Sequence, residues 1–284
     1  YYNDNANVHR GVHTLSQRAT DAMEGVRDQV REHIGARESA EIIFTRGITD
    51  SINTVAFGMG ALIKPHQNVV ITALEHHSNI VPWQMLCERT GATLRYIPIN
   101  EKGELILHSL EEIIDENTAM VAINHISNSL GTVNPVSTTL ARAKAVGAWT
   151  LVDGAQTGPH AKVNVQDWDV DFFTLASHKM YGPTGLGVLY GKRERLEALP
   201  PYQGGGEMIA TVTLEKSTYA EIPHKFEAGT PHIEGVIGFG AALKFMNSIG
   251  IEAIAQHEAE LLDYATVSLS SIEGFRIIGT ADHK

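Results

Sequence analysis

One lysine of this sequence stands where a buried strand is predicted to end. The stretch D-F-F-T-L-A-S-H-K-M-Y-G-P-T-G-L-G, residues 171–187, is an apolar run followed by two small residues, a histidine, Lys179 and a glycine-rich tail. A lysine that forms a Schiff base needs a lowered pKa, which burial or neighbouring cations supply. The commoner arrangement for a lysine is simply to extend from a strand end into solvent. The residues that follow the other strands therefore decide between the two.

Two other predicted strands are followed by groups suited to binding an anion and a cation. Gly47-Ile48-Thr49 begins a predicted helix, whose free amides and dipole favour a phosphate, with the Thr49 hydroxyl as a further donor. The alternative is an ordinary threonine cap. Asp153 ends an apolar run, where an ionised carboxylate needs a cationic partner, and the alternative is an Asx-turn. Gln156, three residues on, either donates to the same ligand or is solvated.

Two more polar residues follow strands, and each has a plain alternative. His76 either stacks on a planar ligand, binds a metal or is a satisfied core histidine, and Asn128 is a candidate turn residue. The set is more informative than its members. A phosphate anchor, a carboxylate for a pyridinium nitrogen, an aromatic histidine and a burial-tuned lysine are the parts that a pyridoxal-phosphate site needs.

The elements that position these groups alternate along the chain. Apolar runs that predict strands lie at 41–45, 68–74, 93–99, 118–124, 148–153, 170–176 and 186–190. Helical patterns lie at 15–34, 50–62, 79–89 and 137–147, the last opening on a Ser/Thr cap, and at 233–248 and 251–271; glycine-rich loops follow Gly191. Such alternation predicts an α/β fold with a mainly parallel seven-stranded sheet and helices on both faces. Ligands bind such sheets outside the carboxyl ends of the strands.

Composition narrows the possible partners. The 284 residues carry a formal net charge of −11 without a basic block, which argues against nucleic acid as a partner. No apolar run approaches the ~20 residues of a membrane-spanning helix. The single cysteine, Cys87, excludes an internal disulfide framework and fits a reducing, cytoplasmic setting. The chain starts at Tyr1 and stops within an apparent new strand, so we expect it to be incomplete at both ends.

Several motifs, taken in order, resemble a known family. The lysine motif is similar to that of class V aminotransferase-like, fold-type I pyridoxal-phosphate enzymes. Further stretches are similar to the SUF-type (group II) cysteine desulfurases, over nearly the whole chain. These are V-H-R-G-V-H-T-L-S (8–16), E-H-H-S-N-I-V-P-W-Q (75–84), H-I-S-N-S-L-G-T (125–132), V-D-G-A-Q (152–156), G-G-G-E-M-I (204–209) and F-E-A-G-T-P (226–231).

The resemblance implies a role for each candidate residue. Lys179 would carry the cofactor and act in catalysis with His76, which would stack on the ring. Asp153 would pair with the pyridine nitrogen. The resemblance implies that Gln156 and Asn128 contact the phenolic oxygen and that Thr49 and His178 hold the phosphate. The family motif often has serine and then a small residue before His-Lys, so Ala176-Ser177 implies a phosphate-binding hydroxyl that is lost or displaced to Ser177.

The resemblance also implies a reaction and partners. Family members convert L-cysteine to L-alanine and place the sulfur on an enzyme cysteine, from which it passes to an acceptor protein for iron–sulfur cluster assembly. They are homodimers, and Thr230 would reach the phosphate of the other subunit's cofactor. Residues 1–248 would form the cofactor domain, and 249–284 would begin a small C-terminal domain that is largely missing. The family's sulfur-carrying cysteine and its substrate-carboxylate arginine would lie beyond Lys284, and Cys87 does not match that cysteine. We therefore expect little or no desulfurase activity from this polypeptide.

Three other interpretations remain open. Within the fold, the alternative is a selenocysteine lyase or another class V activity. From a different class, a metal-dependent hydrolase would use strand-end ligands, namely Glu75, His76, His77, His125 and Asp153. That interpretation leaves Lys179 and the Gly-Ile-Thr segment unexplained. The third is a non-catalytic partner protein in sulfur transfer.

Overall fold

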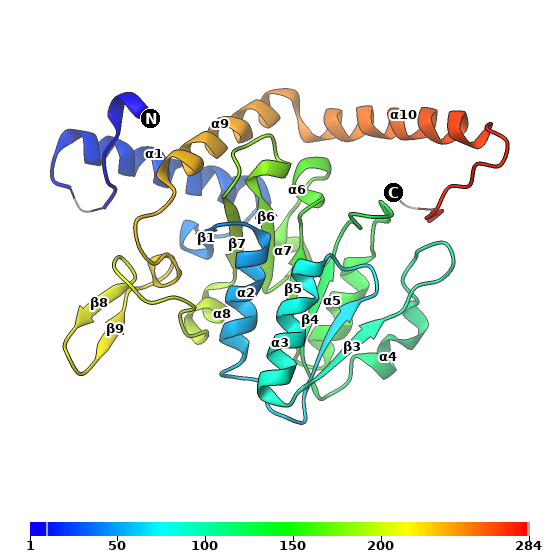
Figure 1. Ribbon diagram of the computed structural model, residues 1–284, viewed down its shortest axis with the longest axis horizontal. Helices are drawn as coiled ribbons and strands as arrows, with labels where there is room; N and C mark the ends of the chain where they lie inside the picture. Colours follow the sequence, from blue (N-terminus) through cyan, green and yellow to red (C-terminus); the bar gives the residue numbers. More distant parts are fainter. Residues whose placement is uncertain (10, 283–284) are drawn as a thin grey trace.

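The computed structural model describes residues 1–9 and 11–282, and a single sheet of seven strands forms its centre (Figure 1). The strand order is β1-β7-β6-β5-β4-β2-β3. Only β7 runs antiparallel to its neighbours, and the other four pairings are parallel. All seven predicted strands are confirmed: β1 Ile42–Thr45, β2 Asn68–Thr72, β3 Thr93–Ile97, β4 Thr118–Asn124, β5 Trp149–Asp153, β6 Phe172–Ala176 and β7 Gly187–Gly191.

Helices cover both faces of the sheet, as predicted. One face packs against α1 (Thr14–Ile34), α5 (Val136–Ala145), α7 (Val165–Trp168) and α9 (Ile233–Ile249), and α1 and α9 lie side by side (Figure 1). The other face packs against α2 (Ile48–Met59), α3 (Val81–Thr90) and α8 (Arg193–Ala198). Consecutive strand residues such as Ile42 and Ile43 enter opposite cores. The strands are apolar without alternation because both of their faces are buried.

Helix ends follow from local chemistry, with one correction. At α1, the His13 side chain accepts the Ser16 amide, and Gly35 ends the helix with a φ of 68°, a conformation that favours glycine. The predicted Ser/Thr cap of α5 is wrong. The helix begins earlier, at Val136 after Pro135, and no side chain caps it. The proline ring fixes φ at a value that leads directly into a helix, so no serine cap is needed there.

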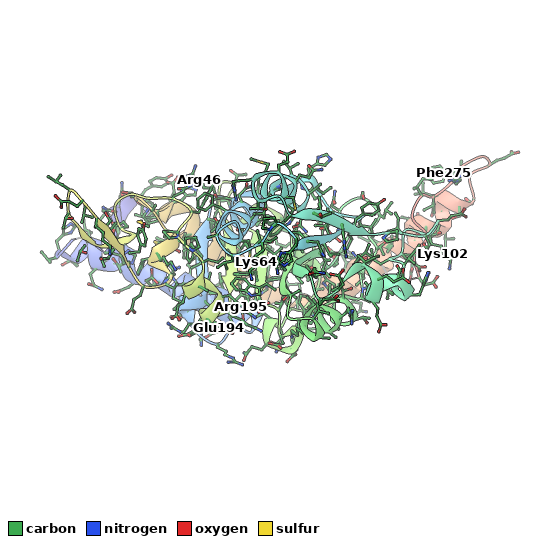
Figure 2. All side chains as sticks on the ribbon, turned by 90° about the horizontal axis from the view of Figure 1, so that it is seen from below. Arg46, Lys64, Lys102, Glu194, Arg195 and Phe275 are labelled. Atoms are coloured by element: carbon green, nitrogen blue, oxygen red, sulfur yellow. The ribbon has the colours of Figure 1, made fainter. Side chains whose placement is uncertain are left out.

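Two peripheral parts extend from the sheet. The hairpin of β8 (Ile209–Val212) and β9 (Ser217–Tyr219) is exposed along its length, and α10 (Ile251–Ser270) leaves α9 at a bend of 73°. Figure 2 shows Phe275, just beyond α10, at the opposite end of the molecule from this hairpin. The predicted domain boundary at 248/249 lies within the last turn of α9, just before Gly250, and stays a prediction. The shorter elements are α4 (Leu110–Ile113), α6 (Thr157–His160) and the 3₁₀ turns η1 (Tyr2–Asp4), η2 (Ser39–Glu41), η3 (His77–Asn79), η4 (Leu107–Ser109), η5 (Ser177–Lys179) and η6 (His224–Phe226).

No single helix of the described chain has the length and hydropathy of a membrane span; α9 and α10 meet that criterion only as a bent pair. Helix α10 exposes several large apolar side chains, and Ile254 is its one buried residue.

Candidate active site

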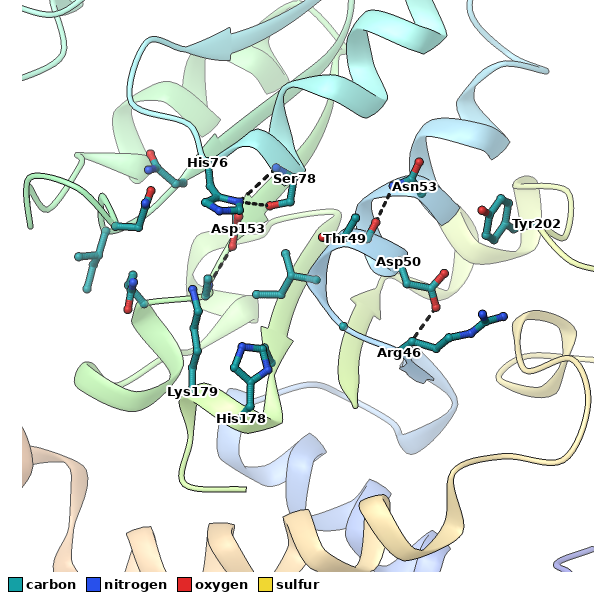
Figure 3. A pocket seen from close by; sticks show the side chains of 18 residues that line it. Arg46, Thr49, Asp50, Asn53, His76, Ser78, Asp153, His178, Lys179 and Tyr202 are labelled. Atoms are coloured by element: carbon teal, nitrogen blue, oxygen red, sulfur yellow. Dashed lines mark hydrogen bonds between the residues drawn. The ribbon is translucent and has the colours of Figure 1, made fainter. Parts of the chain in front are cut away.

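A cavity of about 660 Å³ opens where the carboxyl ends of the parallel strands meet (Figure 3). It brings together seven of the nine residues that the sequence analysis singled out for cofactor binding: Thr49, His76, Asn128, Asp153, Gln156, His178 and Lys179. These residues come from five separate segments, each of which follows or ends a strand. Such a cavity is the expected ligand site of an open α/β sheet.

Lys179 reaches this cavity from a short turn. The turn η5 (Ser177–Lys179) follows β6 directly, and the amides of Met180 and Gly182 both bond to the Ser177 carbonyl. Lys179 is half-buried, and its side chain points toward Asp153 and His76 (Figure 3). The buried strand therefore places one amine inside a polar cavity.

Asp153 is the last residue of β5 and is only 3% exposed. Its Oδ1 accepts the Ala155 amide at 2.9 Å, which is the Asx-type bond of the plainer interpretation. Within the described residues Oδ2 has no hydrogen-bond partner, and no cation lies within ion-pair distance. Burial raises the pKa of this carboxyl, while the Ala155 amide and the charges of Lys179 and His76 act in the opposite direction. The site thus holds a buried carboxyl that can accept a further donor.

The start of α2 supplies the part of the cavity that is suited to binding an anion. Its N-cap is Gly47, no side chain caps the helix, and Gly47, Ile48 and Thr49 all line the cavity. Thr49 is therefore not the cap, and its exposed side chain lies in the first turn. Uncapped amides at a helix N-terminus attract phosphate and carboxylate groups. A Cβ on Gly187 would lie 2.5 Å from the Gly47 backbone, so glycine at 187 allows this turn to pack against the sheet.

The His76 ring is fixed by its own turn. His76 Nδ1 accepts the Ser78 amide at 3.2 Å and lies 2.9 Å from Ser78 Oγ (Figure 3). A neutral ring that accepts at Nδ1 carries its proton on Nε2. The exposed ring is thus held at the cavity wall in a defined orientation.

Two of the predicted residues do not line this cavity. Ser177 is fully buried, and its hydroxyl has no partner among the described residues and faces Gly182. Ala176 lines the cavity in its place. Thr230 lines a second cavity of about 490 Å³, which shares Arg46 and Asp50 with the first.

Other lining residues were not identified as site residues from the sequence. They are Arg46, Asp50, Asn53, Ser78, Asn124, Ile126 and Tyr202, with the small residues Ala155 and Ala176. For Asn124 a signal exists, because this polar residue closes the apolar run of β4. No comparable signal marks Tyr202, which comes from a loop far along the sequence.

The metal interpretation lacks a ligand cluster. In the described part of the chain, no group of three or more His, Cys, Asp or Glu side chains is placed to hold an ion. His125 is turned toward Thr157 and Trp168 instead, and burial lowers its pKa to about 4. Cys87 is a buried thiol in α3 whose pKa is raised by burial to about 11. An unreactive thiol is therefore expected at Cys87.

Comparisons with known proteins agree with this geometry. The sequence matches the class-V aminotransferase family over residues 1–284. It is 50% identical over 281 residues to a cysteine desulfurase of Enterobacter sp. (strain 638), covering 98% of this chain and 69% of that protein. The apo cysteine desulfurase of Thermococcus onnurineus NA1 has a TM-score of 0.92 and 40% identity, over 95% of this chain and 68% of that one. SspA in complex with cysteine has a TM-score of 0.72 and 25% identity, over 85% of this chain and 65% of that one. The chain belongs to the class-V aminotransferase family and, within it, to the cysteine desulfurases.

Proposed function

We propose that the chain forms the pyridoxal-phosphate site of a SUF-type cysteine desulfurase that takes L-cysteine as its substrate. The observation that carries this proposal is the meeting of three groups in one cavity: the Lys179 amine, the buried Asp153 carboxyl and the uncapped start of α2. Membership of the cysteine desulfurases supports the choice of reaction, and the match of SspA, a structure in complex with cysteine, supports the substrate.

The residues present fit this cofactor. Its aldehyde, its pyridine nitrogen and its phosphate need an amine, an acceptor and an anion site, and the cavity offers Lys179, Asp153 and the α2 amides with Thr49 and His178. The free Oδ2 of Asp153 suits a pyridinium N–H, because a buried carboxylate is stabilised by a cationic donor. Bound pyridoxal phosphate withdraws electrons from the α-carbon of an attached amino acid.

Each residue then has a physical task. Asp153 would hold the proton on the pyridine nitrogen, and the Lys179 amine would carry the aldehyde group and move the proton at the substrate α-carbon. His76 would pack on the ring, and Asn128 and Gln156, which line the same cavity, would donate to its phenolic oxygen. Ser177 is not assigned to the phosphate, because its hydroxyl faces Gly182 on the other side of the strand end.

The partners of this function are a second copy of the chain and a sulfur acceptor. We infer a cytoplasmic homodimer in which Thr230 of each subunit approaches the phosphate held by the other, since Thr230 lines the adjoining cavity rather than the main one. The sulfur would pass to an acceptor protein for iron–sulfur cluster assembly.

The experiment is a product assay on the chain reconstituted with pyridoxal phosphate. L-Cysteine, L-selenocysteine and L-serine are supplied with an added dithiol as sulfur acceptor, because Cys87 is buried. Without the dithiol we expect little or no turnover, because Cys87, the one cysteine of the sequence, is buried. With the dithiol we expect alanine and sulfide from L-cysteine, none from L-serine, and none from Lys179→Ala. Alanine from L-selenocysteine alone would indicate a lyase, and alanine production that survives Lys179→Ala would refute the assignment.

A further inference from the structure

A buried carboxyl group lies directly behind the cavity wall and is not used by the function proposed above. Glu75, the residue before His76, is 8% exposed. Its Oε1 accepts the Thr72 hydroxyl at 2.7 Å and the Asn124 amide at 2.9 Å, and its Oε2 accepts the Asn79 side-chain amide at 2.7 Å. A buried carboxyl with every oxygen bonded is a fixed structural link.

The donors around Glu75 have a defined direction. The Trp83 indole N–H donates to Asn79 Oδ1 at 2.8 Å, which leaves the Asn79 amide to donate toward Glu75. An indole nitrogen can only donate, so the Asn79 side chain cannot be reversed. The Asn124 amide is a backbone donor and is equally fixed. Each oxygen of Glu75 must therefore accept one N–H.

Glu75 joins two parts of the cavity wall. The Glu75–Asn79 bond closes a turn over residues 76–78, and the Asn79 backbone amide also donates to the His76 carbonyl at 2.8 Å. This turn carries His76 and Ser78, both of which line the cavity. On the other side, Asn124 lines the cavity and is the register neighbour of Asp153 in the sheet.

We propose that Glu75 is a positioning residue: through Asn79 and Asn124 it fixes the His76 ring relative to Asp153, and so sets the geometry with which the cavity holds its ligand. This inference deepens the proposed function and rests on it for the identity of the ligand, pyridoxal phosphate.

Charge and hydrogen-bond direction can be separated at this position. Burial raises the pKa of Glu75 to about 8; its three donors oppose this shift and Asp153 adds to it. A change to glutamine removes this carboxyl group and also reverses the direction of one hydrogen bond, so a second substitution is needed to restore the carboxyl. A glutamine has only one accepting atom, so in either orientation its NH₂ group faces the Asn79 amide or the Asn124 amide.

The test compares the single variant Glu75→Gln with a double variant in which the hydrogen bond between positions 75 and 79 runs in the opposite direction. Glu75→Gln places two donors face to face. In the double variant Glu75→Gln/Asn79→Asp, the NH₂ group introduced at position 75 donates to the carboxylate introduced at position 79. The second oxygen of that carboxylate accepts from Trp83, and the new side-chain carbonyl at position 75 faces the Asn124 amide. Every hydrogen bond is restored and the single carboxyl is kept.

A control residue lies at the amino ends of the same strands, at the far side of the sheet from the cavity. Asp115 links the starts of β2 and β4, accepting from the Asn68 side chain at 3.1 Å, the Asn117 amide at 3.0 Å and Arg95 at 2.8 Å. Asp115→Asn disturbs the same strands and lies away from the cavity, since Asp115 is not among its lining residues.

Three quantities are measured on each form. They are the dissociation constant of pyridoxal phosphate, the induced circular dichroism of the bound chromophore, and the hydrogen exchange of residues 74–80 and 121–125 in the unliganded chain. We expect Glu75→Gln to weaken binding about tenfold or more, to change the dichroism and to speed exchange in both segments. The double variant recovers all three, and Asp115→Asn changes none of them.

The proposal would be overturned if Glu75→Gln kept the wild-type dissociation constant and the wild-type dichroism. It would also be overturned if Glu75→Gln changed both and the double variant did not restore them. Failure of the wild-type chain to bind pyridoxal phosphate would contradict the proposed function instead. In that case the exchange data still decide whether Glu75 fixes the wall: unchanged exchange in Glu75→Gln would overturn the inference as well.

Discussion

Asp153 and Asp171 are both buried carboxyl groups, but only one of them has a cationic partner. Asp171 is 2% exposed and bonds to Arg195 at 3.0 Å and to the Thr150 amide at 2.9 Å. Asp153 has the Ala155 amide and no ion pair within the described chain. An unpaired buried carboxyl lowers stability, and a ligand cation would remove that cost. We interpret Asp153 as a group whose partner arrives with the cofactor.

The two aspartates should therefore respond oppositely to neutralisation. At neutral pH we expect Asp153→Asn to raise the free energy of unfolding of the unliganded chain by about 1–3 kcal/mol and to weaken pyridoxal-phosphate binding. We expect Asp171→Asn to lower that free energy by about 1–3 kcal/mol, because it removes the charge that faces Arg195 and Lys192, whose side chains stay partly exposed. Urea unfolding and cofactor titration measure both effects. Loss of stability in Asp153→Asn would contradict this view of Asp153.

The same residue predicts a pH dependence with a definite sign. The pKa of Asp153 is raised in the folded chain above its usual value of 3.8. Its destabilising effect is therefore absent below about pH 4 and grows as the pH rises through the folded pKa. Between these limits the free energy of unfolding of the wild-type chain should fall more steeply with pH than that of Asp153→Asn. Parallel pH profiles for the two chains would show that Asp153 is not the cause.

The sequence predicted which residues lie together at the strand ends, but not the direction of every side chain. Lys179, Asp153 and His76 were placed in one site because parallel strands end at one edge. The motif implied a phosphate-binding hydroxyl that is lost or displaced to Ser177, and Phe173 and Leu175 of β6 face the α1–α9 core. Continued alternation puts Ser177 on that side and Ala176 on the other. The sequence shows which residues of β6 share a face, but it does not show which helices cover each face.

At the scale of elements, the position of α2 depends on a close approach to the sheet. A Cβ on Gly187 would meet the Gly47 backbone at 2.5 Å, and backbone cannot yield without moving the start of α2. At the other end of β7, a Cβ on Gly191 would meet the Leu196 side chain at 2.8 Å. Side chains adjust more easily than backbone does.

This pair of glycines gives an element-scale test of the phosphate anchor. We expect Gly187→Ala to weaken binding of pyridoxal phosphate, and of inorganic phosphate as its competitor, by about tenfold or more because the α2 amides are displaced. We expect Gly191→Ala to lower the melting temperature while both affinities stay close to wild type. Isothermal titration and thermal unfolding compare the two. Equal losses of affinity in both variants would point to general destabilisation.

Elements of the sheet were predictable, and the periphery was not. The seven strands read as apolar runs because they are buried on both faces. The hairpin of β8 and β9 was missed because its exposed strands lack such a run and glycine-rich loops precede it. The Glu75–Asn79–Trp83 link was also missed: two successive spacings of four residues suggest proximity, but only the fold shows that Asn124 completes the link.

At the scale of the whole molecule, the placement of Thr230 predicts that cofactor binding and association are linked. Thr230 lies in the cavity adjoining the main one, and under the proposed dimer it contacts the phosphate of the other subunit. We expect pyridoxal phosphate to shift the chain toward the dimer in sedimentation velocity experiments. Thr230→Ala should reduce this shift and leave the unliganded distribution unchanged. A monomer that binds the cofactor with full affinity at every protein concentration would contradict the linkage.

The central claim is that Lys179 carries the cofactor, and Lys225 provides the contrast. Burial lowers the pKa of Lys225, but its amine donates to the carbonyls of Leu196 and Glu197, away from the cavity. The decisive measurement adds pyridoxal phosphate, records the visible spectrum, reduces with borohydride and maps the labelled peptide. We expect a yellow species fixed on Lys179, absent in Lys179→Ala and kept in Lys225→Ala. No colour, or a label on Lys225 or another lysine, would contradict it.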